Sequence, residues 1–354
     1  MRSNTSVRKA DALQDKPKKK NKKLQITTAG DLLNRPEVIR EHLITHWLRE
    51  TESMLLWAPT GVGKTMFSMS LALLVAGGGK LLEWEAQRPR KVLIIDGEMH
   101  MEDLRERIKL LLNSMKELNK QAALDNLGIL ARQAQDPSVK FPDLAKEEGR
   151  ASVFDRARNG GYDLVILDNF STLAEIEDEN SAGAMNPILQ MLHKFKQVGI
   201  ACVLVHHSDK GGNNYRGSSK IATTFEWIVG LTKPKNVEAM TTKFDVQWDK
   251  IRGKRDERIH QGLTLQLDER GKWQGGPAES VKCQKLIDLI WTYDYKTQEE
   301  LAEAMEVSSG TLSKLKKDAI NKYKLITERE WKECLKAARD EDFAGDAPEE
   351  DASF

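Results

Sequence analysis

Residues 54–65 read Met-Leu-Leu-Trp-Ala-Pro-Thr-Gly-Val-Gly-Lys-Thr, and a long apolar segment with helix-forming residues follows them. Glycines allow backbone N–H groups to curl around phosphate oxygens, a lysine neutralises the β and γ phosphates, and a hydroxyl at a helix N-terminus holds Mg²⁺. The stretch is therefore predicted to be a phosphate-binding loop between a strand and a helix. The residues expected to bind the nucleotide are Thr60, Gly61, Val62, Gly63, Lys64, Thr65 and Met66.

One position departs from the usual GxxxxGK[ST] pattern, because Ala58 stands where the first glycine is expected. Alanine lacks only the freedom to adopt a positive φ at low cost. We expect the loop to form if Ala58 lies in an ordinary β or right-handed helical conformation.

The chain has 354 residues, of which 40% are hydrophobic, and this predicts about two domains with a proper core. No run approaches the ~18 apolar residues of a membrane span, and the basic N-terminus lacks the apolar core of a signal peptide, so a cytoplasmic location is expected.

Cys202, Cys283 and Cys334 are far apart without metal-ligand spacing and are expected to be buried free thiols.

The formal net charge of +1 hides opposite charges at the two ends. Residues 1–23 carry nine basic residues against two acids, and are expected to form a disordered leader that either grips nucleic-acid phosphates or is simply solvated. Residues 339–354 are expected to form an acidic disordered tail that either solubilises the chain or docks on a partner or on the chain itself.

Between the tails, helical periodicity over residues 24–50 predicts an amphipathic lead-in helix. Apolar strands then alternate with helices, which predicts an α/β fold with a parallel sheet covered by helices on both faces. The predicted strands are 53–57, 91–96, 126–130, 164–168, 201–206 and 226–231, and the predicted helices are 66–76, 101–119, 151–159 and 185–198. An antiparallel pair, 244–252 with 258–267, and a linker at 275–277 are expected to end this domain.

Ligands of open α/β sheets lie at the carboxyl ends of the strands, where this chain places several polar residues. Asp168 is predicted to be a Walker B carboxylate that binds Mg²⁺ together with Thr65. Glu98 is predicted to be the general base that aims water at the γ-phosphate, with Asp96 as the alternative. His207 or His206 could sense the γ-phosphate; a metal pair is disfavoured, because adjacent strand residues point to opposite faces.

Together these motifs resemble the RecA/DnaB superfamily of AAA-like P-loop ATPases, and in particular the RepA-type hexameric replicative helicases of plasmids and mobile elements. The resemblance covers residues 26–252. It is carried by the APTGVGKT loop, Glu98, the LVILDNF strand, Glu179-Asn180, the segment 206–210 and the segment 216–219.

The resemblance implies ATP and Mg²⁺ as cofactors, bound through Lys64 and Thr65. It also implies a water-activating Glu98 and a γ-phosphate sensor at His207. Basic residues would complete the site of the neighbouring subunit in a homo-oligomer, expected to be a hexamer. The candidates, among which the choice stays open, are Arg216, Lys250 and Arg252. Lys250 and Arg252 could instead be solubilising charges of an edge strand.

Two further regions predict nucleic-acid contacts. The loop 208–220 carries Lys210, Tyr215, Arg216 and Lys220 and would face single-stranded DNA in the channel of a ring, whereas residues 171–186 are too acidic for that role. The helices 281–293, 297–305 and 310–322 predict a small (winged) helix-turn-helix domain over residues 280–338, with a capping box at Thr297. This domain would bind duplex DNA or serve as a docking module.

The predicted domains are thus a RecA-like ATPase at 24–275 and the helix-turn-helix at 280–338. The predicted function is an ATP-dependent ring motor on single-stranded DNA, a replicative helicase. The rival is a non-unwinding regulatory or recombination ATPase that uses ATP as an assembly switch. A small-molecule kinase is a third possibility, but no lid segment supports it.

Overall fold

The computed structural model describes residues 24–176, 183, 185–209, 212, 214–215, 223–234, 242–252, 262–321, 323 and 325–344. Contacts between Cα atoms divide the chain into two compact units, Met1–Ile39 and Arg40–Phe354. No helix among the described residues combines the length and the apolar character that crossing a membrane requires.

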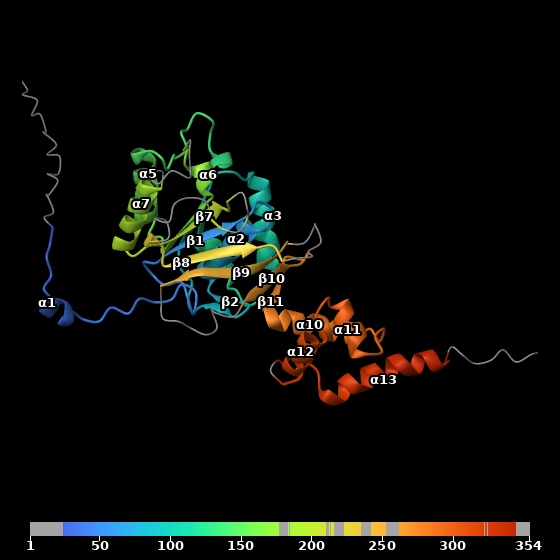
Figure 1. Ribbon diagram of the computed structural model, residues 1–354. Helices are drawn as coiled ribbons and strands as arrows, with labels where there is room; N and C mark the ends of the chain where they lie inside the picture. Colours follow the sequence, from blue (N-terminus) through green and yellow to red (C-terminus); the bar gives the residue numbers. More distant parts are fainter. Residues whose placement is uncertain are drawn as a thin grey trace, which may run out of the picture. The chain divides into compact units, whose positions relative to one another are not determined.

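The larger unit is built on a sheet whose centre is parallel, as predicted (Figure 1). The parallel strands lie in the order β8-β1-β7-β6-β4-β5. Three of them, β1, β4 and β6, are buried along their whole length, which explains why they are continuous apolar runs in the sequence. Their bounds are β1 Ser53–Ala58, β4 Val92–Asp96, β5 Leu127–Ala131, β6 Leu164–Asp168, β7 Ala201–His207 and β8 Trp227–Thr232.

Three antiparallel strands extend the sheet beyond β8 to nine strands: β9 Thr242–Ile251, β10 Leu263–Leu267 and β11 Trp273–Pro277. The expected linker at residues 275–277 is wrong, because these residues form the end of β11 and pair with Leu263, Thr264 and Leu265 of β10. Gly275 has a φ of 154°, and its missing side chain lets the carbonyl of Thr264 approach closely. Gly275 thus serves close strand pairing rather than a flexible connection.

Helices cover both faces of the sheet, and each face has its own apolar core. Strand β1 shows the alternation: Met54 and Leu56 enter the core beneath α2 and α3, while Leu55 and Trp57 enter the core beneath α5 and α7. The bounds are α2 Lys64–Gly77, α3 Met101–Ser114, α4 Lys120–Asn126, α5 Glu147–Asn159, α6 Phe170–Leu173 and α7 Asn186–Gln197, with a hairpin of β2 Gly79–Leu81 and β3 Trp84–Ala86 and a 3₁₀ turn η1 Arg132–Ala134. The expected helix 101–119 is shorter in the structure, because α3 ends at Ser114, and the separate helix α4 begins after residue 119.

The predicted lead-in helix over residues 24–50 is also wrong. Only α1 Ala29–Leu33 is helical there, and Pro36 follows it. Further along, His46 and Thr51 adopt positive φ angles of 74° and 65°, which no helix allows. Trp47 is buried among Trp84, Trp227 and Trp248 at centroid distances of 5.5, 6.2 and 5.4 Å, so packing rather than helical periodicity sets this segment.

The C-terminal helices are α10 Ala278–Ile290, α11 Gln298–Ala304, α12 Ser309–Asn321 and α13 Glu328–Ala344, and they share a separate apolar core. The capping box of Thr297 and Glu300 is present. No strand pairing that would form a wing occurs in the described residues after α12, where α13 is found instead. Because α13 extends to Ala344, residues 339–344 of the expected acidic tail are helical.

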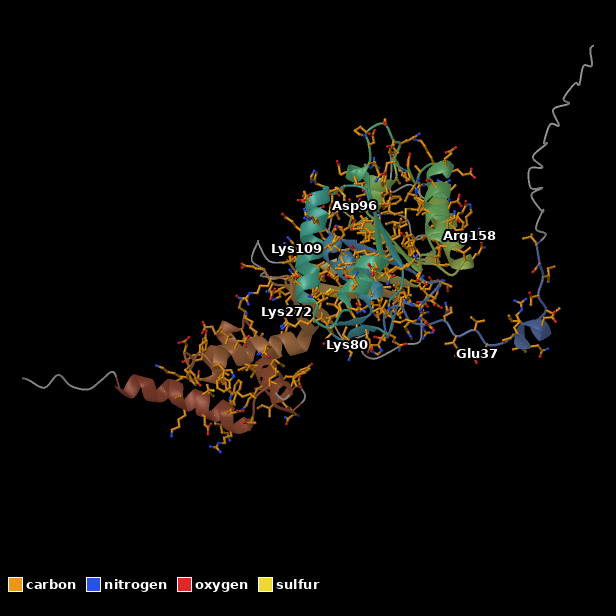
Figure 2. All side chains as sticks on the ribbon, turned by 180° about the vertical axis from the view of Figure 1, so that it is seen from behind. Glu37, Lys80, Asp96, Lys109, Arg158 and Lys272 are labelled. Carbon is orange, nitrogen blue, oxygen red and sulfur yellow. The ribbon has the colours of Figure 1, made fainter. Side chains whose placement is uncertain are left out.

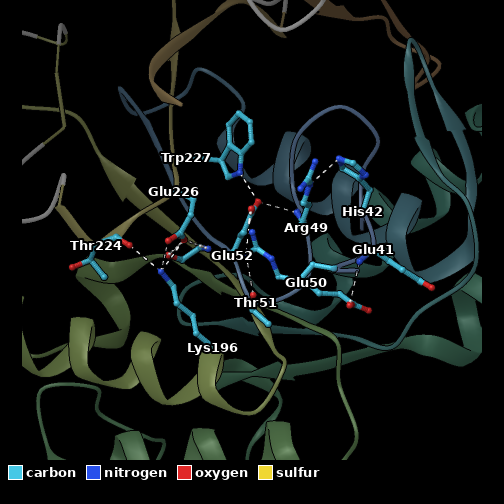
Figure 3. Close-up of polar contacts among 12 residues, drawn as sticks. Glu41, His42, Arg49, Glu50, Thr51, Glu52, Lys196, Thr224, Glu226 and Trp227 are labelled. Atoms are coloured by element: carbon cyan, nitrogen blue, oxygen red, sulfur yellow. Dashed lines mark hydrogen bonds and ion pairs between the residues drawn. The ribbon is translucent and has the colours of Figure 1, made fainter. Parts of the chain in front are cut away.

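An ion pair fixes the start of β8 against α7 and β1 (Figure 3). Lys196 Nζ lies 2.8 and 2.7 Å from the two carboxylate oxygens of Glu226, and the backbone N–H of Ser53 donates to the same carboxylate at 2.8 Å. Burial alone would raise the pKa of Glu226, but the hydrogen bonds from Lys196 and Ser53 outweigh it and hold the pKa below 4.5. The ionised carboxylate therefore stabilises the fold.

We predict that Glu226→Gln costs about 2 kcal/mol of unfolding free energy at neutral pH, because charged hydrogen bonds are lost. Because the pKa of Glu226 is lower in the folded state, its carboxylate stabilises the fold at any pH above its unfolded-state pKa of 4.5. This stabilisation is lost as the pH falls through the folded-state pKa. The gap between wild type and variant in urea denaturation should therefore close between about pH 5 and about pH 3. The exposed control Glu106→Gln should leave stability nearly unchanged, and a gap independent of pH would contradict the assignment.

Candidate nucleotide site

The predicted phosphate loop connects the end of β1 to the start of α2. Gly61 and Gly63 have positive φ angles of 79° and 113°, and a Cβ on Gly63 would lie 2.6 Å from Thr242 Cγ2. Both positions thus need glycine. Ala58 is the last residue of β1 and has no positive φ, so the departure from the usual pattern occurs where alanine is tolerated.

Lys64 lies at the centre of the site and is buried. Its ammonium donates to the carbonyl oxygens of Ala58 and Pro59 at 2.9 and 3.1 Å, and lies 3.3 Å from Nδ1 of His207. Burial lowers the pKa of Lys64, whereas the charges of Asp168 and Glu98 oppose that shift. Residues at the ends of β1, β6 and β7 and in the turn after β4 therefore converge on one ammonium group.

Asp168, at the end of β6, faces the first turns of α2. Its carboxylate accepts a hydrogen bond from the hydroxyl of Ser68 at 3.1 Å, and the nearby hydroxyl of Thr65 also acts to lower its pKa. Burial raises the pKa of Asp168 to about 6, and the charge of Asp96, its register partner on β4, adds to the shift. A buried carboxylate beside a threonine hydroxyl is the hard oxygen set that Mg²⁺ prefers, so these residues fit the predicted metal.

Glu98 lies in the turn that follows β4. Oδ1 of Asp96 accepts the backbone N–H groups of Glu98 and Met99 at 3.0 and 2.7 Å, so Asp96 holds the turn. Burial raises the pKa of Asp96. Nδ2 of Asn169 donates to Oε2 of Glu98 at 3.0 Å, which orients the carboxylate. This division of roles favours Glu98 over Asp96 as the general base.

The two histidines at the end of β7 point to opposite faces of the sheet, as strand geometry requires. His206 is fully buried and contacts the ring of Phe170 edge-on, with centroids 5.0 Å apart. His207 pairs in register with Ala58 and faces Lys64. Of the two, only His207 is placed to contact a phosphate bound at Lys64.

Lys250 and Arg252 lie where the parallel strand β8 begins, whereas the nucleotide site lies where the parallel strands end. Ile251 between them pairs with Trp227 at the start of β8, near the ion pair of Glu226. Burial lowers the pKa of Lys250, and the charge of Arg252 adds to that effect. Arg252 is exposed, and its guanidinium donates to the carbonyl of Thr223 at 2.9 Å.

Several predicted residues lie outside the described part of the chain. These are Glu179, Asn180, Lys210, Arg216 and Lys220, together with the motif segment 216–219. Among the described residues, no group of three or more His, Cys, Asp or Glu side chains gathers in a way that could hold a metal ion by itself.

Sequence reasoning missed Ser68 and Asn169. Ser68 lies one helical turn after Lys64, and Asn169 directly follows the strand that ends in Asp168. Both polar residues lie beside the motifs in the sequence. Their partners, Asp168 for Ser68 and Glu98 for Asn169, are 100 and 71 positions away, so the spacing of residues could not predict these hydrogen bonds.

Comparison with known proteins finds a matching family and similar solved structures. Residues 18–213 match the family described as AAA domain. Three solved structures are similar to the chain. A KaiC-like protein from the hyperthermophilic archaeon Pyrococcus horikoshii OT3 is 15% identical over 67% of this chain and 94% of its own length, with a TM-score of 0.49. The RadB recombinase is 15% identical over 63% and 90%, with a TM-score of 0.43. The flagellar accessory protein FlaH from Methanocaldococcus jannaschii is 11% identical over 65% and 91%, with a TM-score of 0.45.

We predict that Asn169→Ala lowers the kcat of ATP hydrolysis about 10- to 100-fold, because Glu98 loses the donor that orients it. ATP affinity should stay unchanged, since Asn169 does not contact Lys64 or Thr65. Asn119→Ala is the matched control: Asn169 and Asn119 both cap helices, α6 and α4, by accepting a backbone N–H. Equal losses of kcat in the two variants would show that Asn169 acts only as a helix cap.

Proposed function

The chain belongs to the AAA domain family, and from that premise we propose that it is an ATP-dependent ring motor on single-stranded DNA, a replicative helicase. The coarser statement, a P-loop ATPase of RecA-like fold, follows from the family and the sheet topology. The observation that carries the proposal is the convergence of Lys64, Asp168, Glu98 and His207 at one edge of the sheet.

The proposed reaction is transfer of the γ-phosphoryl group to water. The backbone of the glycine-rich loop and the ammonium of Lys64 would bind the phosphates and offset their charge. Glu98, oriented by Asn169, would accept a proton from the attacking water. Thr65 and Asp168 would hold Mg²⁺, which would supply positive charge beside the phosphates.

His207 would report the state of the γ-phosphate. Because its ring lies 3.3 Å from the Lys64 ammonium, a phosphate bound to Lys64 would fall within its reach. His207 is also followed by the segment 208–220, the predicted DNA-contacting loop, whose residues Ser208 and Tyr215 form an isolated β-bridge. Loss of the γ-phosphate would thus alter the position of His207 and, through it, the conformation of the segment 208–220.

The ring belongs to the proposal because two of the basic candidates, Lys250 and Arg252, lie too far from the nucleotide site of their own chain to complete it. Lys250 and Arg252 lie near the amino-terminal ends of the parallel strands, whereas Lys64 lies just beyond the carboxyl-terminal end of β1. A neighbouring copy docked head to tail would present these two basic residues to the nucleotide, which makes hydrolysis depend on assembly. Arg252 is exposed and Lys250 is half-buried, so Arg252 is the better candidate for the basic residue that completes the neighbouring subunit's site, called the finger below. Arg216 stays a candidate outside the described residues.

In this proposal residues 24–275 hold the ATPase and residues 280–338 bind duplex DNA. Support for the second part comes from α12, on which Lys314 and Lys317 are exposed while Leu312 and Leu315 are buried. A basic helix face over an apolar core is typical of a DNA-reading helix.

That same C-terminal region favours the alternative function, a non-unwinding regulatory or recombination ATPase that uses ATP as an assembly switch. A forked duplex separates the two functions. The helicase proposal predicts ATP-dependent strand displacement, whereas ATP hydrolysis stimulated by DNA without displacement would support the alternative.

We predict that Glu98→Gln lowers kcat by about 10²- to 10⁴-fold while ATP binding persists, because only proton transfer is lost. Arg252→Ala should be similarly slow. Mixing the two variants should restore part of the activity, since some sites then combine an intact Glu98 with an intact Arg252 from a neighbour. The exposed Arg158→Ala is a control that should neither lower kcat nor change the mixing result. No recovery on mixing would exclude Arg252 as a finger acting between subunits.

A further inference from the structure

The predicted DNA-contacting loop starts beside the phosphate loop, at the carboxyl ends of the parallel strands, where Asp96 is labelled in Figure 2. The backbone N–H of Ser208, the first residue of the DNA-contacting loop, donates to the carbonyl oxygen of Ala58 at 3.1 Å. That oxygen also accepts a hydrogen bond from the Lys64 ammonium at 2.9 Å. One carbonyl group of β1 therefore contacts both the lysine expected to bind phosphate and the loop expected to bind DNA.

Trp57, the residue before this carbonyl, spans the sheet from β1 to β9. It pairs in register with Gly230 of β8, which in turn pairs with Gln247 of β9. A Cβ on Gly230 would lie 2.4 Å from the Trp57 ring, so the indole occupies the space that a side chain would fill. From there its Nε1 donates to Oδ2 of Asp249 on β9 at 2.6 Å. The carboxyl end of β1 is thus fixed to a strand two positions away in the sheet.

A β-bulge aims Asp249 at this indole. The neighbours of Asp249 on β9, Trp248 and Lys250, lie opposite consecutive residues of β8, so Asp249 is the extra residue of the pairing. Its second carboxylate oxygen, Oδ1, accepts a hydrogen bond from Nε2 of Gln247 at 2.6 Å. Bulges beside active sites often serve to re-aim one side chain, and here the side chain is a carboxylate.

Two further residues of the DNA-contacting loop lie against this part of the sheet. Burial raises the pKa of Tyr215, and the charge of Asp249 adds to that shift, so the phenol and the carboxylate lie close together. Tyr215 also packs against the apolar core to which Trp57 belongs. A Cβ on Gly212 would lie 3.5 Å from Cγ of Pro59. The described part of the loop is therefore packed on the end of β1 and on the residue that follows it.

We propose that Asp249 is a positioning residue that couples the DNA-contacting loop to the nucleotide site. Its hydrogen bond to Trp57 holds the carboxyl end of β1 against β9, which fixes the carbonyl of Ala58. Because Lys64 and Ser208 both donate to that carbonyl, a change at the loop then reaches the lysine instead of being absorbed by β1. Coupling between two sites requires such a rigid connection, and without it the two ligands bind independently.

This inference rests on the proposed function, because it takes the loop as the site of single-stranded DNA and Lys64 as the site of ATP. It goes beyond the sensor role of His207, since Asp249 acts through Trp57 rather than on the phosphate.

The coupling is measured with a fluorescently labelled single-stranded oligonucleotide. Its dissociation constant is determined without nucleotide and then with Mg²⁺ and a saturating, non-hydrolysable ATP analogue, so that a change in affinity for the analogue does not enter the ratio. In the wild type the two dissociation constants should differ at least about fivefold. In Asp249→Ala the ratio should fall close to one.

Three variants separate this role from a general loss of structure. Asp249→Asn keeps an oxygen that accepts the indole N–H, so it should retain the wild-type ratio. Trp57→Phe removes the donor and should lose the coupling as Asp249→Ala does. Asp245→Ala is the matched control, because Asp245 lies on the same strand and accepts a hydrogen bond from Thr264 of the neighbouring strand. It should keep the wild-type ratio.

A wild-type ratio in Asp249→Ala would overturn the inference, as would a ratio of one in the wild type. Equal losses in Asp249→Asn and Asp249→Ala would also overturn it, since the hydrogen bond to Trp57 would then not be what couples the sites. An equal loss in Asp245→Ala would do so too, because any defect of β9 would then suffice.

The proposed function is judged separately, by hydrolysis and strand displacement. A chain that couples the two ligands through Asp249 but hydrolyses no ATP would refute the motor and leave the role of Asp249 standing. A motor that displaces strands while Asp249→Ala keeps the wild-type ratio would do the reverse.

Discussion

The site depends on the register of four parallel strands. Ala58 of β1 lies beside His207 of β7, and Asp96 of β4 lies beside Asp168 of β6, so the residues that end these strands meet at one edge. A shift by one residue would turn each of these side chains to the other face. The apolar residues behind them, which alternate between two cores, hold the register against such a shift.

Register also creates a cost that the site must offset. Two buried carboxylates on neighbouring strands repel each other, and burial raises the pKa of both Asp96 and Asp168. Backbone N–H groups compensate Asp96, while Ser68, Thr65 and Lys64 compensate Asp168. Bound Mg²⁺ would complete that compensation. Asp96 therefore holds the turn, and the Glu98 carboxylate, which accepts a hydrogen bond from Asn169, is the one that we propose as the general base.

Much of this could be predicted from the sequence, since strands buried on both faces are continuous apolar runs and each predicted parallel strand lies within a residue or two of the observed one. The failures have physical causes. The apolar residues around Trp47 have helical spacing but are buried in turns by three other tryptophans, and Gly275 pairs in β11 because its partner strand is close. Ser68 and Asn169 were missed because their partners are distant in sequence, and α13 lay partly within a segment whose charge favours disorder.

The central claim is that Lys64, Thr65, Glu98 and Asp168 surround one triphosphate. Isothermal titration of the chain with ATP in the presence of Mg²⁺ tests it most directly, with Lys64→Ala and the remote Lys285→Ala for comparison. The account predicts one nucleotide bound per chain, binding lost in Lys64→Ala and binding retained in Lys285→Ala. No heat of binding in the wild type, or equal binding by Lys64→Ala, would contradict it.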